Sequence, residues 1–194
     1  MRALLVTFSF HHRNTEKVAN AFAEVLDAEV KAPQQVDPEE LQEYDLVGFG
    51  SGIYDGRHHK VLLDLADRLP QVTDKKAFIF STSALTGKSK VTKDHSPLRE
   101  RLESKGYMVV DEFNCPGWDT NSDYDSGIVL AAVSAAVKLI GGLNKGRPNA
   151  QDLKDAEEFA QKLKQGLQET APARAPDDGD SICKKGAVVQ RVEE

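Results

Sequence analysis

Cysteine and long apolar runs are scarce in this chain, and each absence excludes a class of protein. The only cysteines among the 194 residues, Cys115 and Cys183, stand far apart and form no CxxC pair. We therefore expect no disulfide framework, and we expect the protein to work in a reducing, cytoplasmic compartment. The most apolar stretch, residues 128–140, is too short to span a bilayer, so we expect no transmembrane segment. The N-terminal MRALLVTFSF predicts a first strand rather than a signal peptide.

The charge balance is moderately acidic. With 25 basic and 31 acidic residues, the net charge is -6. This argues against non-specific nucleic-acid binding and favours basic protein partners or neutral ligands. The hydrophobic fraction of 40% is that of an ordinary globular protein, and the length suits one domain with a full core rather than two enzyme domains.

Strand-like segments alternate with helical ones along the chain. Five short runs are rich in β-branched and aromatic residues, at 3–8, 29–32, 46–51, 77–82 and 108–115. Several are apolar on both faces, as in a parallel sheet covered by helices on each side. Helical periodicity lies between them, for example at Val18, Phe22 and Leu26. The pattern predicts an α/β fold: a doubly wound, five-stranded parallel sheet in a three-layer sandwich.

Caps and composition predict where the later elements begin and end. Ser96 and Pro97 resemble an N-cap followed by proline at the first helical position, with Gly106 ending that helix, and Asn149 caps the last helix. After about residue 168 the composition changes to TAPARAPDDGD, typical of a linker. We therefore expect a domain at 1–167 and a linker with a C-terminal tail at 168–194. The apolar face at 128–140 suits core packing or a homodimer contact, and the tail is a second candidate for association.

The loop after the first strand is unusually rich in hydrogen-bond donors. It offers the side chains of Ser9, His11, Arg13, Asn14 and Thr15 where a helix begins. Free backbone N–H groups and the helix dipole favour an anion there, so the loop predicts a phosphate site. The alternative is an ordinary N-cap at Asn14 or Thr15. No glycine lies between Ser9 and Thr15, which excludes the dinucleotide fingerprint.

A second loop imitates the phosphate loop of nucleotide triphosphatases. Residues 82–89, TSALTGKS, follow a strand and end like G-x-x-x-x-G-K-S. Thr82 replaces the first glycine, and the next helix is expected only near Ser96. A triphosphatase is therefore disfavoured.

The loop after the third strand is suited to a flat ring. In a sheet of strand order 2-1-3-4-5 the ligand crevice lies above the first and third strands, so this loop adjoins the phosphate loop. Glycines permit close approach, Tyr54 offers a stacking face and Ile53 excludes water. A phosphorylated planar heterocycle such as FMN fits these features better than a sugar phosphate, although Tyr54 alone could be a surface aromatic. The expected ring contacts are Ser51, Gly52, Ile53, Tyr54, Asp55 and Gly56.

Together these motifs resemble the flavodoxin family over about residues 2–167. They are Ser9-x-His11-x-x-Asn14-Thr15-x-Lys17-Val18-Ala19, Gly50-Ser51-Gly52-Ile53-Tyr54-x-Gly56 and Ser81-Thr82-Ser83. The resemblance implies FMN, with its phosphate in the first loop and its ring against the third, where a backbone hydrogen bond reaches flavin N5. It adds Thr82 and Ser83 to the pocket. It also implies a flavodoxin-like electron carrier that shuttles electrons between redox partner proteins in the cytoplasm.

Two departures from the family pattern leave an enzyme as the alternative. His12 and Arg13 stand where the family has small residues, and an extra segment occupies 119–140. Ile53-x-x-Gly56-x-x-His59 and KLIGG at 138–142 also resemble the flavodoxin-like protoporphyrinogen oxidases. An FMN-dependent oxidoreductase of that type or of the quinone reductase type therefore stays open, as does a flavin-free interaction module. A zinc site at His11, His12, His58 and His59 is disfavoured, because adjacent histidines point apart.

Overall fold

A parallel sheet forms the centre of the molecule. The computed structural model describes residues 1–10, 12–117 and 144–169, and its strands follow the order β2-β1-β3-β5-β6. All four pairings along this path are parallel, so the predicted α/β class and strand order are confirmed. The bounds of the strands are β1 Ala3–Phe8, β2 Ala28–Lys31, β3 Leu46–Tyr54, β5 Lys75–Ser83 and β6 Tyr107–Pro116.

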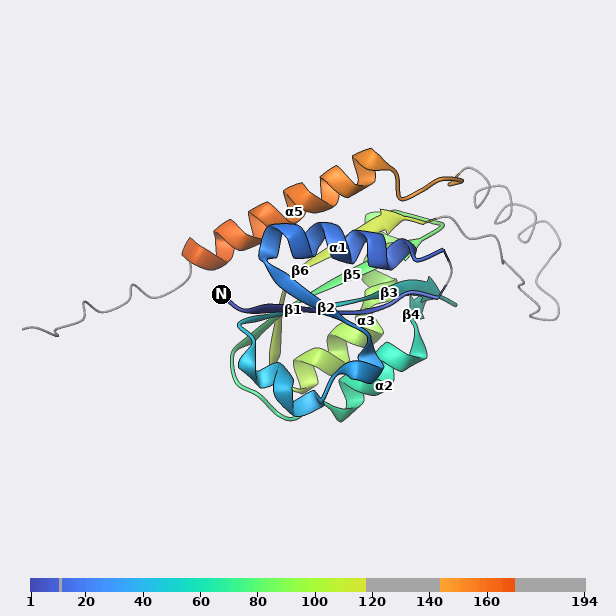
Figure 1. Cartoon of the computed structure of the whole chain (residues 1–194). Helices are drawn as coiled ribbons and strands as arrows, with labels where there is room; N and C mark the ends of the chain where they lie inside the picture. Colours follow the sequence, from blue (N-terminus) through green and yellow to red (C-terminus); the bar gives the residue numbers. More distant parts are fainter. Residues whose placement is uncertain (11, 118–143, 170–194) are drawn as a thin grey trace, which may run out of the picture.

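Helices cover both faces of the sheet, as Figure 1 shows. Helices α1 (Asn14–Leu26) and α5 (Ala150–Glu169) lie on one face, and α2 (Lys60–Arg68) and α3 (Lys88–Ser104) lie on the other. Two 3-10 turns, η1 (Pro33–Gln35) and η2 (Pro38–Glu43), join β2 to β3. The core accordingly has two parts, one around Phe22 and Phe78 under α1 and α5, the other around Leu62 and Leu98.

The third strand is longer than expected and folds back on itself. It reaches Tyr54 and pairs antiparallel with a two-residue strand, β4 (Arg57–His58). Asp55 and Gly56 form the turn, with φ of 51° and 73°. Two positive φ values define the type I′ turn that Asp-Gly favours, so the hairpin is encoded locally.

The predicted start of a helix at Ser96 is wrong. Helix α3 begins at Lys88 and contains Pro97. Proline cannot donate to the Lys93 carbonyl four residues back, but the Ser96 hydroxyl donates to it at 3.1 Å. This local replacement lets the helix pass through Pro97. The predicted stop is right, since Gly106 follows the C-cap with φ 87°.

The last helix is capped as expected. The Asn149 side chain accepts hydrogen bonds from the Gln151 and Asp152 backbone N–H groups. Arg147 forms an ion pair with Asp152 beside this cap. The predicted 119–140 segment, its dimer contact and the tail after residue 169 lie outside the described residues, so the domain division stays a prediction. None of the described helices is long and apolar enough to cross a membrane.

Candidate functional site

The strand register gathers three loops at the carboxyl edge of the sheet. Phe8 lies opposite Ser51, and Ser51 lies opposite Ser81. The chain leaves β1, β3 and β5 just beyond these positions. A fourth segment adjoins them, because the Gly117 N–H after β6 donates to the Ser83 carbonyl at 3.0 Å.

Helix α1 starts without a side-chain cap. Its N-cap is Arg13, with φ 54° and ψ 32°, and Arg13 makes no capping hydrogen bond. Asn14 and Thr15 are the first two helical residues, so neither is an ordinary N-cap. The first-turn N–H groups have no acceptor within the helix, and the positive end of the helix dipole lies there.

Other residues of the first loop point in different directions. The Arg13 guanidinium is exposed and pairs with Glu16, and this hydrogen bond lowers the pKa of the Glu16 carboxyl. Asn14 and Thr15 are buried and Ser9 is half-buried. Residue 11 lies outside the described residues, so His11 is not placed. Arg13 is thus directed to a neighbour in its own helix, whereas Asn14 and Thr15 lie at the sheet edge.

A buried hydroxyl pair joins the first loop to the end of β5. Thr15 Oγ1 and Thr82 Oγ1 are 2.9 Å apart, and the two residues are 1% and 6% exposed. A Cβ on Gly117 would lie 3.1 Å from Thr82 Cβ and 3.4 Å from Asn14 Nδ2. Ser83, also predicted for the site, donates to the Leu85 carbonyl at 2.7 Å. Thus Asn14 and Thr15 from α1 and Thr82 from β5 meet at one point.

Replacing both threonines of this pair with valine should destabilise the protein by less than the sum of the two single replacements. Thr15→Val leaves the Thr82 hydroxyl buried without its partner, which costs about 1–3 kcal/mol, and Thr82→Val does the reverse. The double variant removes both polar groups, so its loss should be smaller than the sum. Urea unfolding of the apo-proteins measures the coupling, and strictly additive losses would show that the hydroxyls do not interact.

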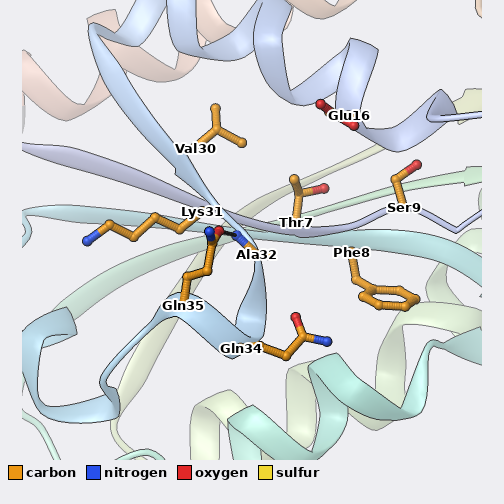
Figure 2. Close-up of a pocket in the computed structure, with 9 residues that line it drawn as sticks. All are labelled: Thr7, Phe8, Ser9, Glu16, Val30, Lys31, Ala32, Gln34 and Gln35. Carbon is orange, nitrogen blue, oxygen red and sulfur yellow. Dashed lines mark hydrogen bonds between the residues drawn. The ribbon is translucent and has the colours of Figure 1, made fainter.

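A cavity of about 300 Å³ lies next to this point, on the β2 side of β1. Figure 2 shows the residues that line it. Of the predicted site residues only Ser9 is among them, together with Thr7, Phe8, Glu16, Val30, Lys31, Ala32, Gln34 and Gln35. The cavity therefore adjoins the first loop but lies away from the third.

The rings of Tyr54, His59 and Phe8 form an aromatic wall beside the third loop. The Tyr54 ring covers Gly52, where a Cβ would lie 3.0 Å from the ring, and meets the His59 ring edge-on at 5.2 Å. His59 stacks on Phe8 at 4.1 Å, and its Nδ1 caps α2 by accepting from the Val61 N–H. The sequence predicted Tyr54 for the site but not the His59 ring beside it or the Phe8 ring that stacks on His59. The available signal was that Phe8 ends the strand beside the loop.

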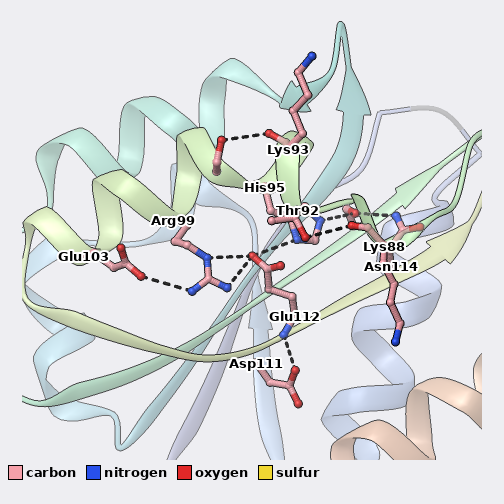
Figure 3. A network of polar contacts seen from close by, with 11 residues as sticks. Lys88, Thr92, Lys93, His95, Arg99, Glu103, Asp111, Glu112 and Asn114 are labelled. Carbon is pink, nitrogen blue, oxygen red and sulfur yellow. Dashed lines mark hydrogen bonds and ion pairs between the residues drawn. The ribbon is translucent and has the colours of Figure 1, made fainter. Parts of the chain in front are cut away.

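Behind this wall lies a buried polar network. Ser51 Oγ is 2.9 Å from His58 Nδ1, and the His58 ring is 4.9 Å from the His95 ring. Figure 3 shows how His95 continues toward Glu112, Arg99 and Asn114. Ser81 Oγ lies 2.7 Å from His95 Nε2 and accepts from Asn114, while Glu112 pairs with Arg99. Ser51, predicted to contact a ring, therefore directs its hydroxyl into the protein.

Burial and neighbouring charges set the pKa values in this network. Burial, and then the adjacent His95, lower the pKa of His58 well below its usual value. Burial alone would raise the pKa of Glu112, but His95 and Arg99 outweigh it and lower that pKa. At neutral pH His58 is therefore uncharged and Glu112 ionised. Within the described residues, no cluster of three potential metal ligands is found.

The buried His58 should make the fold less stable in mild acid. Below about pH 6.5 the unfolded chain protonates this side chain and the folded chain does not, so the unfolding free energy falls by up to about 1.4 kcal/mol per pH unit. The titratable side chains around it are His95 and the Asp94–Lys90 pair on α3, His59 at the start of α2, and Glu112 beyond His95. Urea unfolding between pH 5 and 7 should show a flatter profile for His58→Phe. The exposed His12→Asn is the control, and equal slopes for wild type and His58→Phe would contradict the assignment.

The loop that imitates a triphosphatase motif leads directly into α3, contrary to the expected gap. Lys88 is the first helical residue after Gly87. Gly87 has an extended φ of 168°, and a Cβ there would meet nothing within 4 Å. A triphosphatase stays disfavoured because Thr82 occupies the place of the first motif glycine and pairs with Thr15.

Comparison with known proteins agrees with this arrangement. A family model described as flavodoxin domain matches residues 5–117. An uncharacterized protein of Methanocaldococcus jannaschii is 41% identical over 163 residues, which cover 84% of this chain and 98% of that protein.

Solved flavodoxins share the fold at low sequence identity. The oxidised flavodoxin 2 of Bacillus cereus has a TM-score of 0.60 at 17% identity, covering 86% of this chain and 99% of that one. A flavodoxin from the domain Archaea has a TM-score of 0.54 at 14% identity, covering 87% and 99%. The matched segment, 5–117, contains the carboxyl end of β1, the start of α1 and the loops after β3 and β5 that meet at the sheet edge. With the family model spanning more than half of the sequence, the chain belongs to the flavodoxin domain family.

Proposed function

We propose that this protein binds FMN at the carboxyl edge of its sheet and carries electrons between redox partner proteins in the cytoplasm. The observation that carries the proposal is the start of α1, which has no side-chain cap and lies at the buried Thr15–Thr82 pair. A phosphate needs such donors, and a helix N-terminus supplies them without a dedicated cation. The buried free thiol of Cys115 suits a reducing compartment.

The donor set and the adjoining loop fit FMN. In this proposal the first-turn N–H groups of α1 with Asn14 and Thr15 hold the phosphate, and Ser9 and His11 add donors from the same loop. Thr82 and Ser83 border the ribityl chain, and Ser51 to Gly56 border the ring through backbone and the Tyr54 side chain. Arg13 contributes only if it leaves Glu16. Bound FMN supplies one- and two-electron chemistry, while the chain orients it and keeps water from one side.

The charges around this edge suggest the kind of partner. Exposed cations follow the strands here, Arg57 after β3 and Lys88 and Lys93 after β5, and they outnumber the exposed carboxylate of Asp55 in the turn before Arg57. Lys145 is added by the turn whose Asn144 side chain donates to the Ala84 carbonyl at 2.8 Å. By contrast Asp27, Asp45 and Asp74 directly precede β2, β3 and β5, at the opposite edge. The negative net charge therefore does not describe the proposed docking face, which favours an acidic partner surface.

Reconstitution of the purified full-length protein tests the function. We expect one FMN per chain, with a flavin absorption spectrum, and one-electron oxidation of the photoreduced protein by cytochrome c under anaerobic conditions. Failure to bind FMN would contradict the proposal. Rapid turnover of quinones or of protoporphyrinogen would instead support the oxidoreductase alternative, whose distinguishing segment at 119–140 lies outside the described residues.

The charge of the docking face is tested with small redox probes. The rate at which hexacyanoferrate(III) oxidises the reduced protein should fall as ionic strength rises, and the rate with hexaammineruthenium(III) should increase. Arg57→Glu with Lys88→Glu should reverse both slopes. Lys154→Glu with Lys162→Glu on α5 makes the same change in net charge and should not. If the dependence of both rates on ionic strength follows the net charge of each variant alone, an acidic partner is contradicted.

A further inference from the structure

One hydroxyl group at the end of β3 has more partners than it has protons. Ser51 is fully buried, and its Oγ lies 2.8 Å from the Gly52 carbonyl, 2.9 Å from His58 Nδ1 and 3.0 Å from the His59 N–H. The His59 N–H can only donate to Oγ. The Gly52 carbonyl can only accept, and His58 Nδ1 does either, depending on which ring nitrogen carries the proton.

The position of the proton on His58 therefore decides which acceptor the Ser51 hydroxyl can donate to. With the proton on Nδ1, His58 donates to Oγ and the hydroxyl donates to the Gly52 carbonyl. With the proton on Nε2, Nδ1 becomes an acceptor that competes for the same hydroxyl proton. When His58 wins that competition, the Gly52 carbonyl loses the Ser51 hydroxyl as a donor.

The surroundings of His58 favour the first arrangement. His58 Nε2 is buried and has no hydrogen-bond partner among the described residues. A proton there would be a buried N–H without an acceptor, which costs more than a bare nitrogen lone pair. The neighbouring His95 ring and the burial of the site keep His58 uncharged. The Nδ1–H form is thus the resting state, and the Gly52 carbonyl is held by Ser51.

Gly52 belongs to the segment, Ser51 to Gly56, that the proposed function assigns to the flavin ring. We propose that His58 is a positioning residue which, through the Ser51 hydroxyl, controls whether the Gly52 carbonyl is held by the protein or turned toward a hydrogen-bond donor of the bound ring. This inference rests on the proposed function. A carbonyl that turns away leaves the Ser51 hydroxyl without an acceptor unless His58 moves its proton to Nε2, so the tautomer sets the cost of the turn.

Two substitutions on the same hydrogen-bond chain should then act in opposite directions. Ser51→Ala removes the donor that holds the Gly52 carbonyl, so the reduced, N–H-bearing ring should bind relatively more tightly. His58→Phe removes the competing acceptor and leaves the hydroxyl on Gly52, so the reduced ring should bind less tightly. A loss of packing alone would shift both variants in the same direction. Ser81→Ala is the matched control, because it removes the equivalent serine hydroxyl at His95.

The test combines redox titration with NMR on the full-length protein. We expect about a tenfold change in relative binding of the reduced cofactor for each variant, or about 59 mV in the one-electron potential, upward for Ser51→Ala and downward for His58→Phe. The ring ¹⁵N shifts of His58 should report Nδ1–H in the apo and oxidised protein and Nε2–H after reduction. Shifts of equal sign, or one tautomer throughout, would overturn the inference.

The apo-protein separates this inference from the proposed function. Absence of FMN binding contradicts the function alone. In the same sample the ¹³C shift of the Gly52 carbonyl should indicate a hydrogen bond in wild type and His58→Phe, and its loss in Ser51→Ala. An Nε2–H tautomer in the apo-protein, or a Gly52 shift that Ser51→Ala does not change, would overturn the role of His58.

Discussion

FMN should bind the apo-protein at least about a hundredfold more tightly than riboflavin. The two ligands share the ring and the ribityl chain and differ only in the phosphate. Charge-assisted hydrogen bonds contribute about 1.5–3 kcal/mol each, and the start of α1 offers several. Two of them, at about 3 kcal/mol together, correspond to about two powers of ten in affinity.

Quenching of flavin fluorescence measures both affinities under the same conditions. Thr15→Val should weaken the binding of FMN and leave the affinity for riboflavin almost unchanged, so the ratio of the two affinities should become smaller. Lys162→Glu, far along α5, serves as a control for net charge. Equal affinities of the wild-type protein for FMN and riboflavin would contradict a phosphate site at the start of α1.

Gly106→Ala should lower the free energy of unfolding by about 3 kcal/mol or more, because backbone strain and steric overlap add at this position. Gly106 has φ 87°, a conformation that costs a side-chain-bearing residue about 1–3 kcal/mol. A Cβ there would also lie 1.9 Å from the Val72 carbonyl oxygen, which belongs to the backbone. Relieving this overlap requires movement of a segment that the Val72 N–H fixes to the Lys105 carbonyl at 2.9 Å.

Gly146 provides a matched control for that substitution. Its φ is 82°, almost the same, but a Cβ there would meet nothing within 4 Å. Gly146→Ala should therefore cost only the backbone strain, about 1–3 kcal/mol. Urea unfolding of the two variants separates strain from overlap, and equal losses would contradict the close contact with Val72.

The sheet could be predicted from the sequence because its strands are apolar on both faces. That pattern has few solutions other than a parallel sheet between two layers of helices, and right-handed crossovers limit the strand order. The start of α3 could not be predicted in the same way. Proline usually marks the first turn of a helix. Only the structure shows that the Ser96 hydroxyl donates to the Lys93 carbonyl, which Pro97 leaves without a backbone donor.

The candidate site was predicted in its loops but not in its supporting contacts. Asn14, Thr15 and Thr82 stand out because polar residues follow strands at one edge of the sheet. The pairing of His58 with His95 joins residues 37 positions apart, from a hairpin and from a helix whose start was misplaced. No local spacing signals such a contact. Arg13 also looked like a phosphate ligand by type, yet its guanidinium pairs with Glu16.

Mapping FMN on the ¹⁵N-labelled full-length apo-protein tests the central claim most directly. On addition of one equivalent of FMN, the largest amide shift changes should fall at residues 12–16, 51–57 and 82–83. Riboflavin should reproduce the changes at 51–57 but not those at 12–16. No binding, or changes confined to the cavity residues Val30 to Gln35, would contradict an FMN site at the carboxyl edge of the sheet.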